Sequence, residues 1–410
     1  MTQMDAAKPS TLAAKVAAFY ERHPYPPHTD DLENYRGSWN DARRRADSHL
    51  FWPHEPYRDD RTILVAGCGA SQAARYAMRW PRAQVVGIDV SSTSLQLTAK
   101  LKRKYALSNL DFHKLPVERA ADLGRTFDHI VCTGVLHHLP DPVVGLAALR
   151  DAMAPGGALH LMVYAPYGRA GVYLMQDYCR RLGIGSTGPE IAALLASLKS
   201  LPPDHPLVPL LRNSPDFGAA AGVADALLNP QDRPYDVPQL FGLLRTGGLR
   251  FDRWIRQAPY LAACGAIAAS PHASRLARLA AEDQYAAIEL FRGTMVRHSV
   301  AAYHDASAAP QAVSFDGDGW PGYVPIRLPE TIIVRENLPP GAAAVLINQA
   351  HTYRDLYLPL TGDQVRLVEA IDGARSVAEI AGRGALPNVQ ELFRRLWEYD
   401  QVVFDTSRVG

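Results

Sequence analysis

Residues 61–71 read RTILVAGCGAS, and this stretch decides the fold. Its apolar, β-branched opening is typical of a buried strand, and helical sequence follows at 70–80. Between them, Gly67 and Gly69 leave out side chains where a backbone must turn tightly and come close to a ligand. The N–H groups at the start of the following helix point at whatever lies above the turn. The stretch therefore predicts a strand, a tight loop and a helix, with a ligand above the loop.

The same alternation of strand and helix continues to residue 165. Continuous apolar strands separated by helices are typical of a parallel sheet that is covered on both faces. We therefore predict an α/β fold with a Rossmann-like, doubly wound and mostly parallel sheet. Further strands are expected at 85–88, 110–113, 127–132 and 158–164, and further helices at 92–106 and 142–153.

The pattern changes after the fifth strand. Sequence that is mostly helical, with proline-rich breaks, precedes a strand-like run at 248–255, and 273–303 predicts one long helix or two. Three short amphipathic helices and a strand are expected at 364–371, 376–380, 389–399 and 400–404. The predicted organisation is an N-terminal helical strap or lid at 1–60, a core at 61–165, a helical insertion at 166–245, remaining strand and long helix at 246–325, and a small winged-helix-like domain at 326–410.

The composition of the chain limits the classes of partner that we expect. The 410 residues are 47% hydrophobic and 21% charged, as in globular proteins with a substantial core. The formal net charge of +1 provides no overall field toward polyanions, so we expect no nucleic-acid partner. No signal peptide and no apolar run of about 18 residues is visible, so we expect no membrane association.

The cysteines predict a reducing compartment and no metal. None of Cys68, Cys132, Cys179 and Cys264 lies in a CxxC pair, and no cysteine–histidine group has the spacing of a zinc site. Reduced cysteines at the ends of strands favour a cytoplasmic location.

Asp89 ends the second expected strand, 20 residues after Gly69. A carboxylate at this position of an open α/β sheet can accept both hydroxyl groups of a ribose. The loop reads GCGASQ at 67–72 and lacks the third glycine that a pyrophosphate site needs. A ligand with a ribose and no phosphate fits this loop better than a dinucleotide does.

Four motifs in order make residues 61–165 resemble the class I S-adenosylmethionine-dependent methyltransferases. VAGCGAS matches the first motif, and GIDVS, around Asp89, matches the second. The fourth motif corresponds to FDHIVCTGVLHHLPDP at 127–142, and Pro-Gly-Gly at 155–157 also fits. The third motif departs from the family, because Pro116 stands in the place of its usual acidic residue.

The resemblance implies S-adenosylmethionine as cofactor, S-adenosylhomocysteine as product, and a role for each motif. The glycine loop would face the methionine part, and Asp89 would bind the ribose. The residues after the second and third strands would border the adenine, and those after the fourth would line the route to the sulfonium. The implied cofactor-binding residues are Gly67, Cys68, Gly69, Asp89, Val90, Val117, Glu118 and Thr133.

His137 and His138 are the candidates for a catalytic base, because histidine titrates near neutrality. The paired histidines also recur in this motif among family members with different substrates, which favours a role in orienting the loop. Both interpretations stay open at this point.

Candidate acceptor-binding residues lie outside the cofactor motifs. Tyr20 and Tyr25 belong to the proline-rich turn YERHPYPP, which is either a packed strap or a lid over the cofactor. Arg169 could grip a carboxylate or phosphate, or cap a helix. The full set of acceptor candidates is Tyr20, Tyr25, Tyr164, Tyr167, Arg169 and Arg233, although packing roles are open for each.

Residues 326–410 weakly resemble the PqqD-like winged-helix modules that bind precursor peptides, and a structural appendage or a dimer contact is the alternative. Three functions follow. The first is methyl transfer to an oxygen or nitrogen atom of a small metabolite or natural-product intermediate. The second is methylation of a peptide or protein recruited by the C-terminal domain, and the third is a cofactor-binding scaffold without catalysis. A homodimer is compatible with each.

Overall fold

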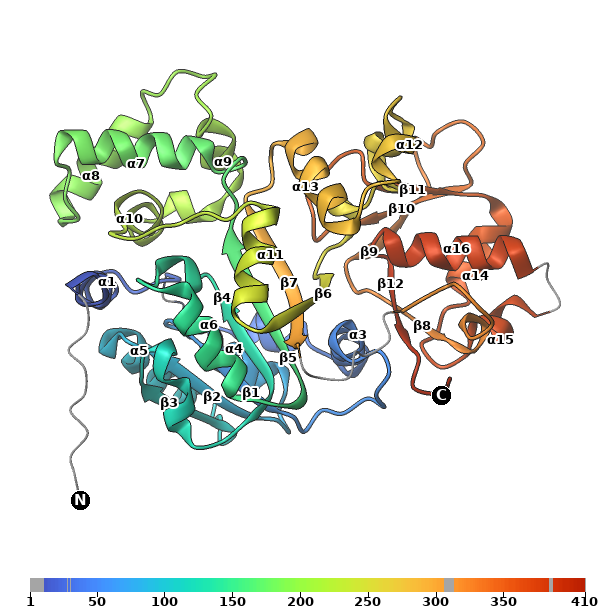
Figure 1. The fold of residues 1–410 in the computed structure, drawn as a ribbon, viewed down its shortest axis with the longest axis horizontal. Helices are drawn as coiled ribbons and strands as arrows, with labels where there is room; N and C mark the ends of the chain where they lie inside the picture. Colours follow the sequence, from blue (N-terminus) through green and yellow to red (C-terminus); the bar gives the residue numbers. More distant parts are fainter. Residues whose placement is uncertain (1–10, 28, 30, 306–312, 383–385, 410) are drawn as a thin grey trace. The chain divides into compact units, whose positions relative to one another are not determined.

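The computed structural model of the protein describes residues 11–27, 29, 31–305, 313–382 and 386–409. The chain divides into two compact units, and both are assembled from segments that lie far apart in the sequence (Figure 1). The first unit consists of Met1–Arg36, Asp60–Arg250 and Gly293–Asp305, and the second of Gly37–Asp59, Phe251–Arg292 and Ala306–Gly410. The expected segment 1–60 is therefore shared between the two units, and so is 246–325.

A seven-stranded sheet with the order β3-β2-β1-β4-β5-β7-β6 organises the first unit. Strands β1 to β5 pair in parallel, and β7 pairs antiparallel with β5. This confirms the Rossmann-like, mostly parallel sheet that the alternating pattern predicted. The strands are β1 (Thr62–Ala66), β2 (Gln84–Asp89), β3 (Leu110–Lys114), β4 (Phe127–Thr133), β5 (Met153–Tyr164), β6 (Leu249–Trp254) and β7 (Arg297–His304).

Helices follow the parallel strands and cover them, so that Leu64, Val65 and Ala66 of β1 are completely buried (Figure 1). Side chains begin two of these helices: Ser91 accepts a hydrogen bond from the backbone of Ser94, and Asp141 caps the helix after it in the same way. The helices are α4 (Gln72–Arg79), α5 (Ser92–Lys104) and α6 (Pro142–Asp151), with 3-10 turns η1 (Val117–Leu123) and η2 (Leu136–His138).

The insertion after β5 is helical, as predicted, and has an apolar core of its own. Val172, Leu194 and Val223 are buried together in this core. The N-terminal helix α1 (Thr11–Arg22) packs on it through Phe19, which contacts Ile191 and Ala224. Ser10, whose residue type favours an N-cap before this helix, lies outside the described residues. The helices of the insertion are α7 (Ala170–Leu182), α8 (Gly188–Leu198), α9 (Val208–Asn213), α10 (Ala220–Leu228) and α11 (Val237–Thr246).

The prediction of helix throughout 273–303 was wrong in its last part. Helices α12 (Ala273–Leu276) and α13 (Ala281–Arg292) end before Gly293, whose φ of +61° stops the helix. Strand β7 follows and pairs with β5 along its whole length, from Ala158 opposite Tyr303 to Tyr164 opposite Arg297. The alanine-rich sequence favours a helix locally. The strand forms instead because the long edge of β5 provides backbone hydrogen-bond partners, and most residues of β7 become buried there.

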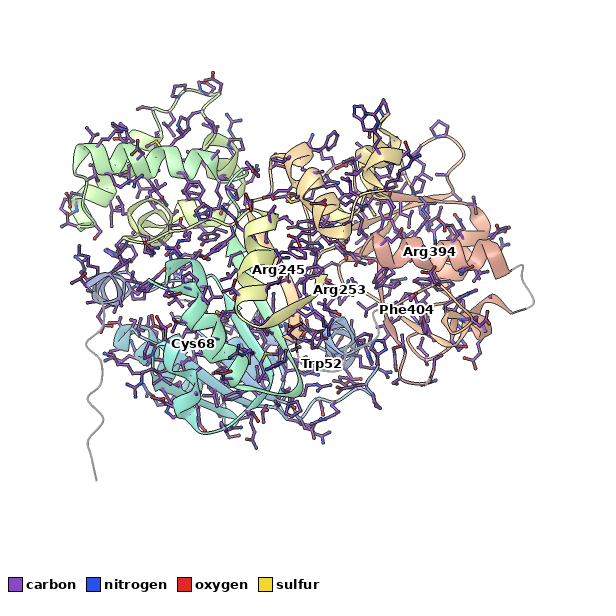
Figure 2. All side chains as sticks on the ribbon, in the orientation of Figure 1. Trp52, Cys68, Arg245, Arg253, Arg394 and Phe404 are labelled. Carbon is purple, nitrogen blue, oxygen red and sulfur yellow. The ribbon has the colours of Figure 1, made fainter. Side chains whose placement is uncertain are left out.

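The second unit combines short helices with two small antiparallel sheets. Its core contains Leu346, Phe393 and Phe404, and Thr406 donates its backbone N–H to the carbonyl of Pro53 at 2.7 Å (Figure 2). The three C-terminal helices and the last strand were predicted, whereas the four strands before them were not. The elements are α3 (Asp41–Phe51), β8 (Val324–Arg327), β9 (Thr331–Val334), β10 (Ala344–Asn348), β11 (Tyr357–Leu360), α14 (Gly362–Glu369), α15 (Val377–Ala381), α16 (Leu386–Glu398) and β12 (Val402–Asp405). None of the helices in the described residues is long and apolar enough to cross a membrane.

Buried His129 on β4 predicts a pH dependence of stability. Burial, reinforced by His160, Arg79 and Arg61, lowers its pKa well below 6.5. A histidine that is held neutral in the folded state takes up its proton only on unfolding, so the free energy of unfolding falls as the pH drops below 6.5. We expect His129→Phe to remove about 1 kcal/mol of the loss between pH 6.5 and 5.5.

Phenylalanine preserves the edge contact with the ring of Tyr76, whose centroid lies 6.2 Å away. Urea titrations at several pH values measure the free energy of unfolding of the wild type and of His129→Phe. The control is His113→Phe, at an exposed site. A difference that stays constant with pH would contradict the assignment.

Candidate active site

The glycine loop after β1 is fixed by the neighbouring elements. Gly67 and Gly69 have φ values of +68° and +54°, a conformation that side chains with a Cβ disfavour. The N–H of Cys68 donates to the carbonyl of Ile88 at 2.9 Å, and the hydroxyl of Thr98 donates to the carbonyl of Gly69 at 3.1 Å. The end of β2 and helix α5 therefore hold the loop in one shape.

The protein itself also requires both glycines. A Cβ on Gly67 would lie 2.3 Å from a methyl group of Val135, and one on Gly69 would lie 2.4 Å from the carbonyl oxygen of Tyr25. The sequence predicted glycines for the approach of a ligand. The structure adds that the loop after β4 and the proline-rich N-terminal turn both close onto this loop.

Asp89 fastens the loop to the end of β2. Its Oδ2 accepts the N–H of Gly69 and its Oδ1 accepts the N–H of Ser91, each at 2.8 Å. Burial raises the pKa of this carboxyl group. The sequence did not predict this bracing role, although a carboxylate with two bonds still has lone pairs for hydroxyl groups of a ribose.

The other cofactor candidates gather around the same edge of the sheet. The N–H of Leu115 donates to the carbonyl of Asp89 at 3.0 Å, which brings the segment after β3 next to the end of β2. Of this segment, Val117 is buried and Glu118 is half-buried, as is Val90. The hydroxyl of Thr133 accepts a bond from the amide of Gln72 at 2.7 Å.

Cys68 contributes only its backbone to the loop surface. Its side chain is completely buried, and a Cβ on Gly87 of β2 would lie 3.0 Å from its sulfur. Burial also raises the pKa of the thiol. The thiol therefore belongs to the core between β1 and β2, and because the N–H of Cys68 already donates to Ile88, its predicted cofactor contact stays a prediction.

A second group of side chains lies just after β4 and β5. His137 is completely buried, with its ring centroid 4.1 Å from that of Tyr164 and 4.2 Å from that of His138. The guanidinium of Arg169 stacks on Tyr164, with Cζ 3.6 Å from the ring centroid. The ring of Tyr20 meets His138 edge-on at 5.9 Å. We call these five residues, with Asp232, the buried polar cluster.

Asp232 completes this cluster, and sequence reasoning missed it. Its Oδ2 accepts a bond from the amide of Gln176 at 3.0 Å and lies 3.4 Å from Nη2 of Arg169. Arg169 also donates from Nε to the hydroxyl of Tyr173 at 3.3 Å, so its side chain does not cap α7. The one sequence signal for Asp232 is the polar run DRPY at 232–235, in which Arg233 and not Asp232 is the predicted acceptor-binding residue.

The side chains of two acceptor candidates, Tyr167 and Arg233, are not part of the buried polar cluster, and their acceptor-binding role stays a prediction. Tyr167 is 39% exposed, and Arg233 is exposed and lines an open surface pocket of about 440 Å³ with Asp141, Tyr235 and Gln239. The side chains at 232 and 233 point differently, so only the aspartate reaches the cluster. Tyr25 contributes its carbonyl group over Gly69, as described above.

The two histidines differ in their electrostatic surroundings and contacts. Burial, with His138 and Arg169 nearby, lowers the pKa of His137 well below 6.5, so this ring is neutral at pH 7 and weakly basic. Nδ1 of His138 lies 2.5 Å from the carbonyl oxygen of Gln231. Because a carbonyl only accepts, Nδ1 carries the proton and Nε2 is left with its lone pair.

Tyr20 ties the N-terminal helix to the insertion. Its hydroxyl donates to Oδ1 of buried Asp225 at 2.8 Å and accepts from the amide of Asn229 at 2.9 Å. We expect Tyr20→Phe to lower the free energy of unfolding of the first unit by about 1–3 kcal/mol, because a buried carboxylate loses its donor. Urea unfolding followed by circular dichroism measures this, with Tyr178→Phe, at a 44% exposed site on α7, as control. Equal stabilities of the two variants would contradict the assignment.

Comparison with known proteins agrees with this architecture. Residues 64–159 match the family described as Methyltransferase domain. An uncharacterized protein of Synechococcus sp. is 31% identical over 272 residues, which are 61% of this chain and 63% of that protein. A ubiquinone biosynthesis O-methyltransferase of Idiomarina loihiensis is 33% identical over 103 residues, covering 24% of this chain and 40% of the enzyme. The chain thus spans less than two thirds of the length of these curated relatives.

A solved structure extends the likeness beyond the core. PKMT2 from Rickettsia typhi aligns with 93% of this chain and 77% of its own, with a TM-score of 0.64 and 16% identity, which shows a shared fold. The same protein has been solved in complex with AdoHcy, with a TM-score of 0.62 and 15% identity. Residues 64–159 therefore form a methyltransferase domain of the class I type that the four motifs predicted, and the cofactor of such domains is S-adenosylmethionine.

Proposed function

We propose that the protein transfers the methyl group of S-adenosylmethionine to an oxygen or nitrogen atom of a small acceptor molecule. The observation that carries this proposal is the buried polar cluster of Tyr20, His137, His138, Tyr164, Arg169 and Asp232. It follows β4 and β5 at their carboxyl ends, where open α/β sheets bind their ligands. A buried group of aromatic rings with a few polar atoms suits the recognition of a small acceptor.

The cofactor loop and this cluster are neighbours through shared covering segments. Val135, which closes onto Gly67, lies two residues before His137. Tyr25, which closes onto Gly69, belongs to the turn that begins at Tyr20, whose ring meets His138. An acceptor in the cluster would therefore lie beside the methyl group of a cofactor that is bound over the loop.

Methyl transfer asks for alignment more than for acid–base assistance. The lone pair of the acceptor attacks the methyl carbon in line, the carbon–sulfur bond breaks, and its electron pair stays on sulfur in S-adenosylhomocysteine. A hydroxyl or ammonium acceptor must first lose a proton. His137 is a weak base for this purpose because of its lowered pKa, and His138 is the better candidate through its free Nε2.

Transfer from cofactor with a tritiated methyl group into a cell extract tests the proposal. The extract is separated into low-molecular-weight and protein fractions, and Asp89→Ala protein is the control. We expect enzyme-dependent label in the low-molecular-weight fraction. Label in the protein fraction alone would refute the small-acceptor proposal, and tight binding of S-adenosylhomocysteine without any labelled product would favour a scaffold.

The second candidate is a peptide or protein acceptor. The observation in its favour is the second unit, which has its own core and lies within the 93% of the chain that shares the fold of PKMT2. Such a unit could recruit a chain whose side chain then enters the cluster. The labelling experiment separates the candidates, because here the protein fraction would carry the label.

A further inference from the structure

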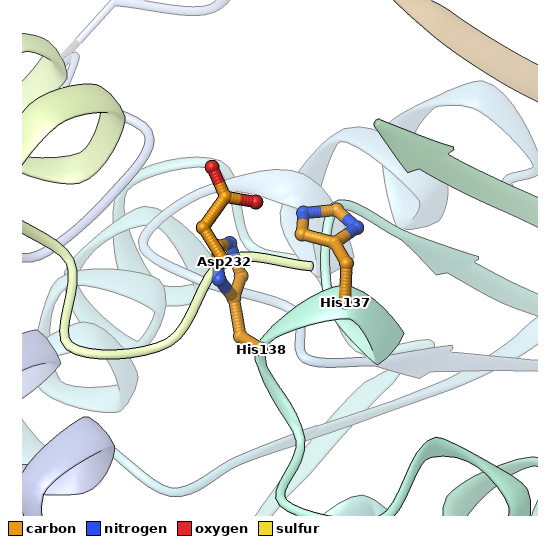
Figure 3. A group of neighbouring side chains, drawn as sticks. All are labelled: His137, His138 and Asp232. Atoms are coloured by element: carbon orange, nitrogen blue, oxygen red, sulfur yellow. The ribbon is translucent and has the colours of Figure 1, made fainter. Parts of the chain in front are cut away.

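We propose that His137, His138 and Asp232 form a binding site for a divalent transition-metal ion of the zinc type, with a coordination position left for the acceptor. The sequence predicted no metal site, because cysteine and histidine spacing gave no signal. The structure brings the aspartate to the histidine pair from a distant loop (Figure 3). Two imidazoles and one carboxylate are a ligand set that zinc accepts, and three protein ligands are typical of sites that keep a position open.

The three possible ligand atoms lie near enough to one another for a single ion to bind all of them after a small movement. One ligand atom from each of the three residues lies within 4.8 Å of the other two. Zinc binds nitrogen and oxygen at about 2.0–2.2 Å, which separates tetrahedral ligands by roughly 3.5 Å. Side-chain rotations that move each ligand atom by about 1 Å would bring the three atoms to this separation. Figure 3 shows the two rings on one short turn, with the carboxylate facing them from the neighbouring loop.

Two of the three proposed ligands, His137 and Asp232, have buried polar atoms without a hydrogen-bond partner. Within the described residues, the two ring nitrogens of His137 have no hydrogen-bond partner, and Oδ1 of Asp232 has none either. His137 is completely buried, and the side chain of Asp232 is 1% exposed. Native structures rarely leave such atoms unpaired, so each calls for an explanation, and an ion is a common one.

In two of the three ligands, His138 and Asp232, the other polar atom has a hydrogen-bond partner, as in known metal sites. The carbonyl of Gln231 accepts from Nδ1 of His138, which leaves Nε2 with its lone pair. Gln176 and Arg169 both approach Oδ2 of Asp232, which leaves Oδ1. Outer partners of this kind fix the tautomer and the direction of metal ligands.

The charges around the site have to accommodate a cation. Arg169 opposes it, but its guanidinium is engaged by Oδ2 of Asp232 and the ring of Tyr164. Buried Asp225 interacts electrostatically with His138, Asp232 and Arg169. Formally, two carboxylates face one guanidinium and neutral imidazoles, which leaves a negative charge for the ion to balance.

The role of the ion rests on the proposed function. A divalent ion lowers the pKa of a hydroxyl group that it binds and orients it. The acceptor would then release its proton to water and attack the methyl carbon, and both histidines would act as ligands of the ion instead of as bases.

Metal binding is tested without reference to turnover. The full-length protein is dialysed against a chelator and then titrated with a zinc salt by calorimetry and with a cobalt(II) salt by visible absorption. We expect one equivalent of either ion per chain and the intense visible bands of low-symmetry cobalt. A wild-type protein that binds neither ion, or binds magnesium but not zinc, would overturn the proposal.

Variants then assign the ligands. We expect His137→Gln and Asp232→Asn each to weaken zinc binding by more than about 100-fold, and Gln176→Leu by about 10–100-fold, as for an outer partner. His272→Gln, at an exposed site in the second unit, is the matched control. Circular dichroism checks folding, and His138→Gln replaces a variant that does not fold. Unchanged affinity in folded ligand variants would refute the site.

The two proposals fail in different ways. Full methyl transfer after removal of all metal would refute the role of the ion and leave the proposed function intact. Stoichiometric binding that depends on the three ligands, with no methylated product from any extract, would leave the metal site intact and refute the function.

Discussion

Exchange of Asp89 for alanine is expected to weaken binding of S-adenosylhomocysteine by at least about 100-fold. The carboxylate accepts the N–H groups of Gly69 and Ser91, so its removal frees the glycine loop as well as the predicted ribose contact. A hydrogen bond to a charged group contributes about 1.5–3 kcal/mol, and a tenfold change in affinity corresponds to about 1.4 kcal/mol. Loss of two ribose bonds would thus reduce affinity by roughly 100-fold to 10,000-fold.

Isothermal titration calorimetry measures this affinity. Asp89→Asn keeps one acceptor oxygen and should fall between wild type and alanine. Asp111→Ala, at a 73% exposed carboxylate on β3, should bind normally. Less than a fivefold effect of Asp89→Ala would show that the cofactor does not lie over this loop.

Exchange of Asp400 for alanine is expected to destabilise the second unit by about 3–5 kcal/mol. The carboxylate is buried and accepts the N–H groups of Gln257 at 3.2 Å and Ala258 at 2.9 Å, with Arg253 at 3.8 Å. It thereby joins the C-terminal end of the chain to the turn after β6. Alanine would leave two buried donors and a guanidinium without their carboxylate, and the φ of +53° at this position is unfavourable for it.

Tryptophan fluorescence during urea unfolding suits this measurement, because five of the six tryptophans lie in the second unit and only Trp80 lies in the first. Asp400→Asn should cost less than alanine, because asparagine keeps one acceptor and tolerates the positive φ. Asp363→Ala, at an 83% exposed residue on α14, should be nearly neutral. A loss below 1 kcal/mol for Asp400→Ala would contradict the bracing role.

Local patterns explain why the core was predictable. Four of the five parallel strands are mainly apolar, β3 alternates apolar and polar residues, and the helices between them are periodic, so each element is encoded by its own residues. The turn at 67–69 needs glycine for its backbone conformation, and Asp89 follows at the end of the next strand. Strand β7 was missed because its alanines and valine carry no preference strong enough to show that β5 offers an edge.

The buried polar cluster was only half predictable for a related reason. His137, His138, Tyr164 and Arg169 stand at the ends of predicted strands, where a ligand site was expected. Asp232 and Gln176 come from the helical insertion and its connecting loop, whose fold no motif specifies. The polar run that contains Asp232 does not show which of its side chains turns inward. The acceptor-binding residue predicted within this run was the exposed Arg233.

The sequence by itself determined the class of fold, the glycine loop and the position of Asp89, because these depend on periodicity and backbone conformation within short stretches. Only the tertiary structure decided the division into two units, the antiparallel β7 and the meeting of Asp232 with the histidine pair. These features depend on which distant surfaces become buried against each other. Gly67 and Gly69 belong to both groups: their spacing predicted the turn, and packing against Val135 and Tyr25 added a second reason for them.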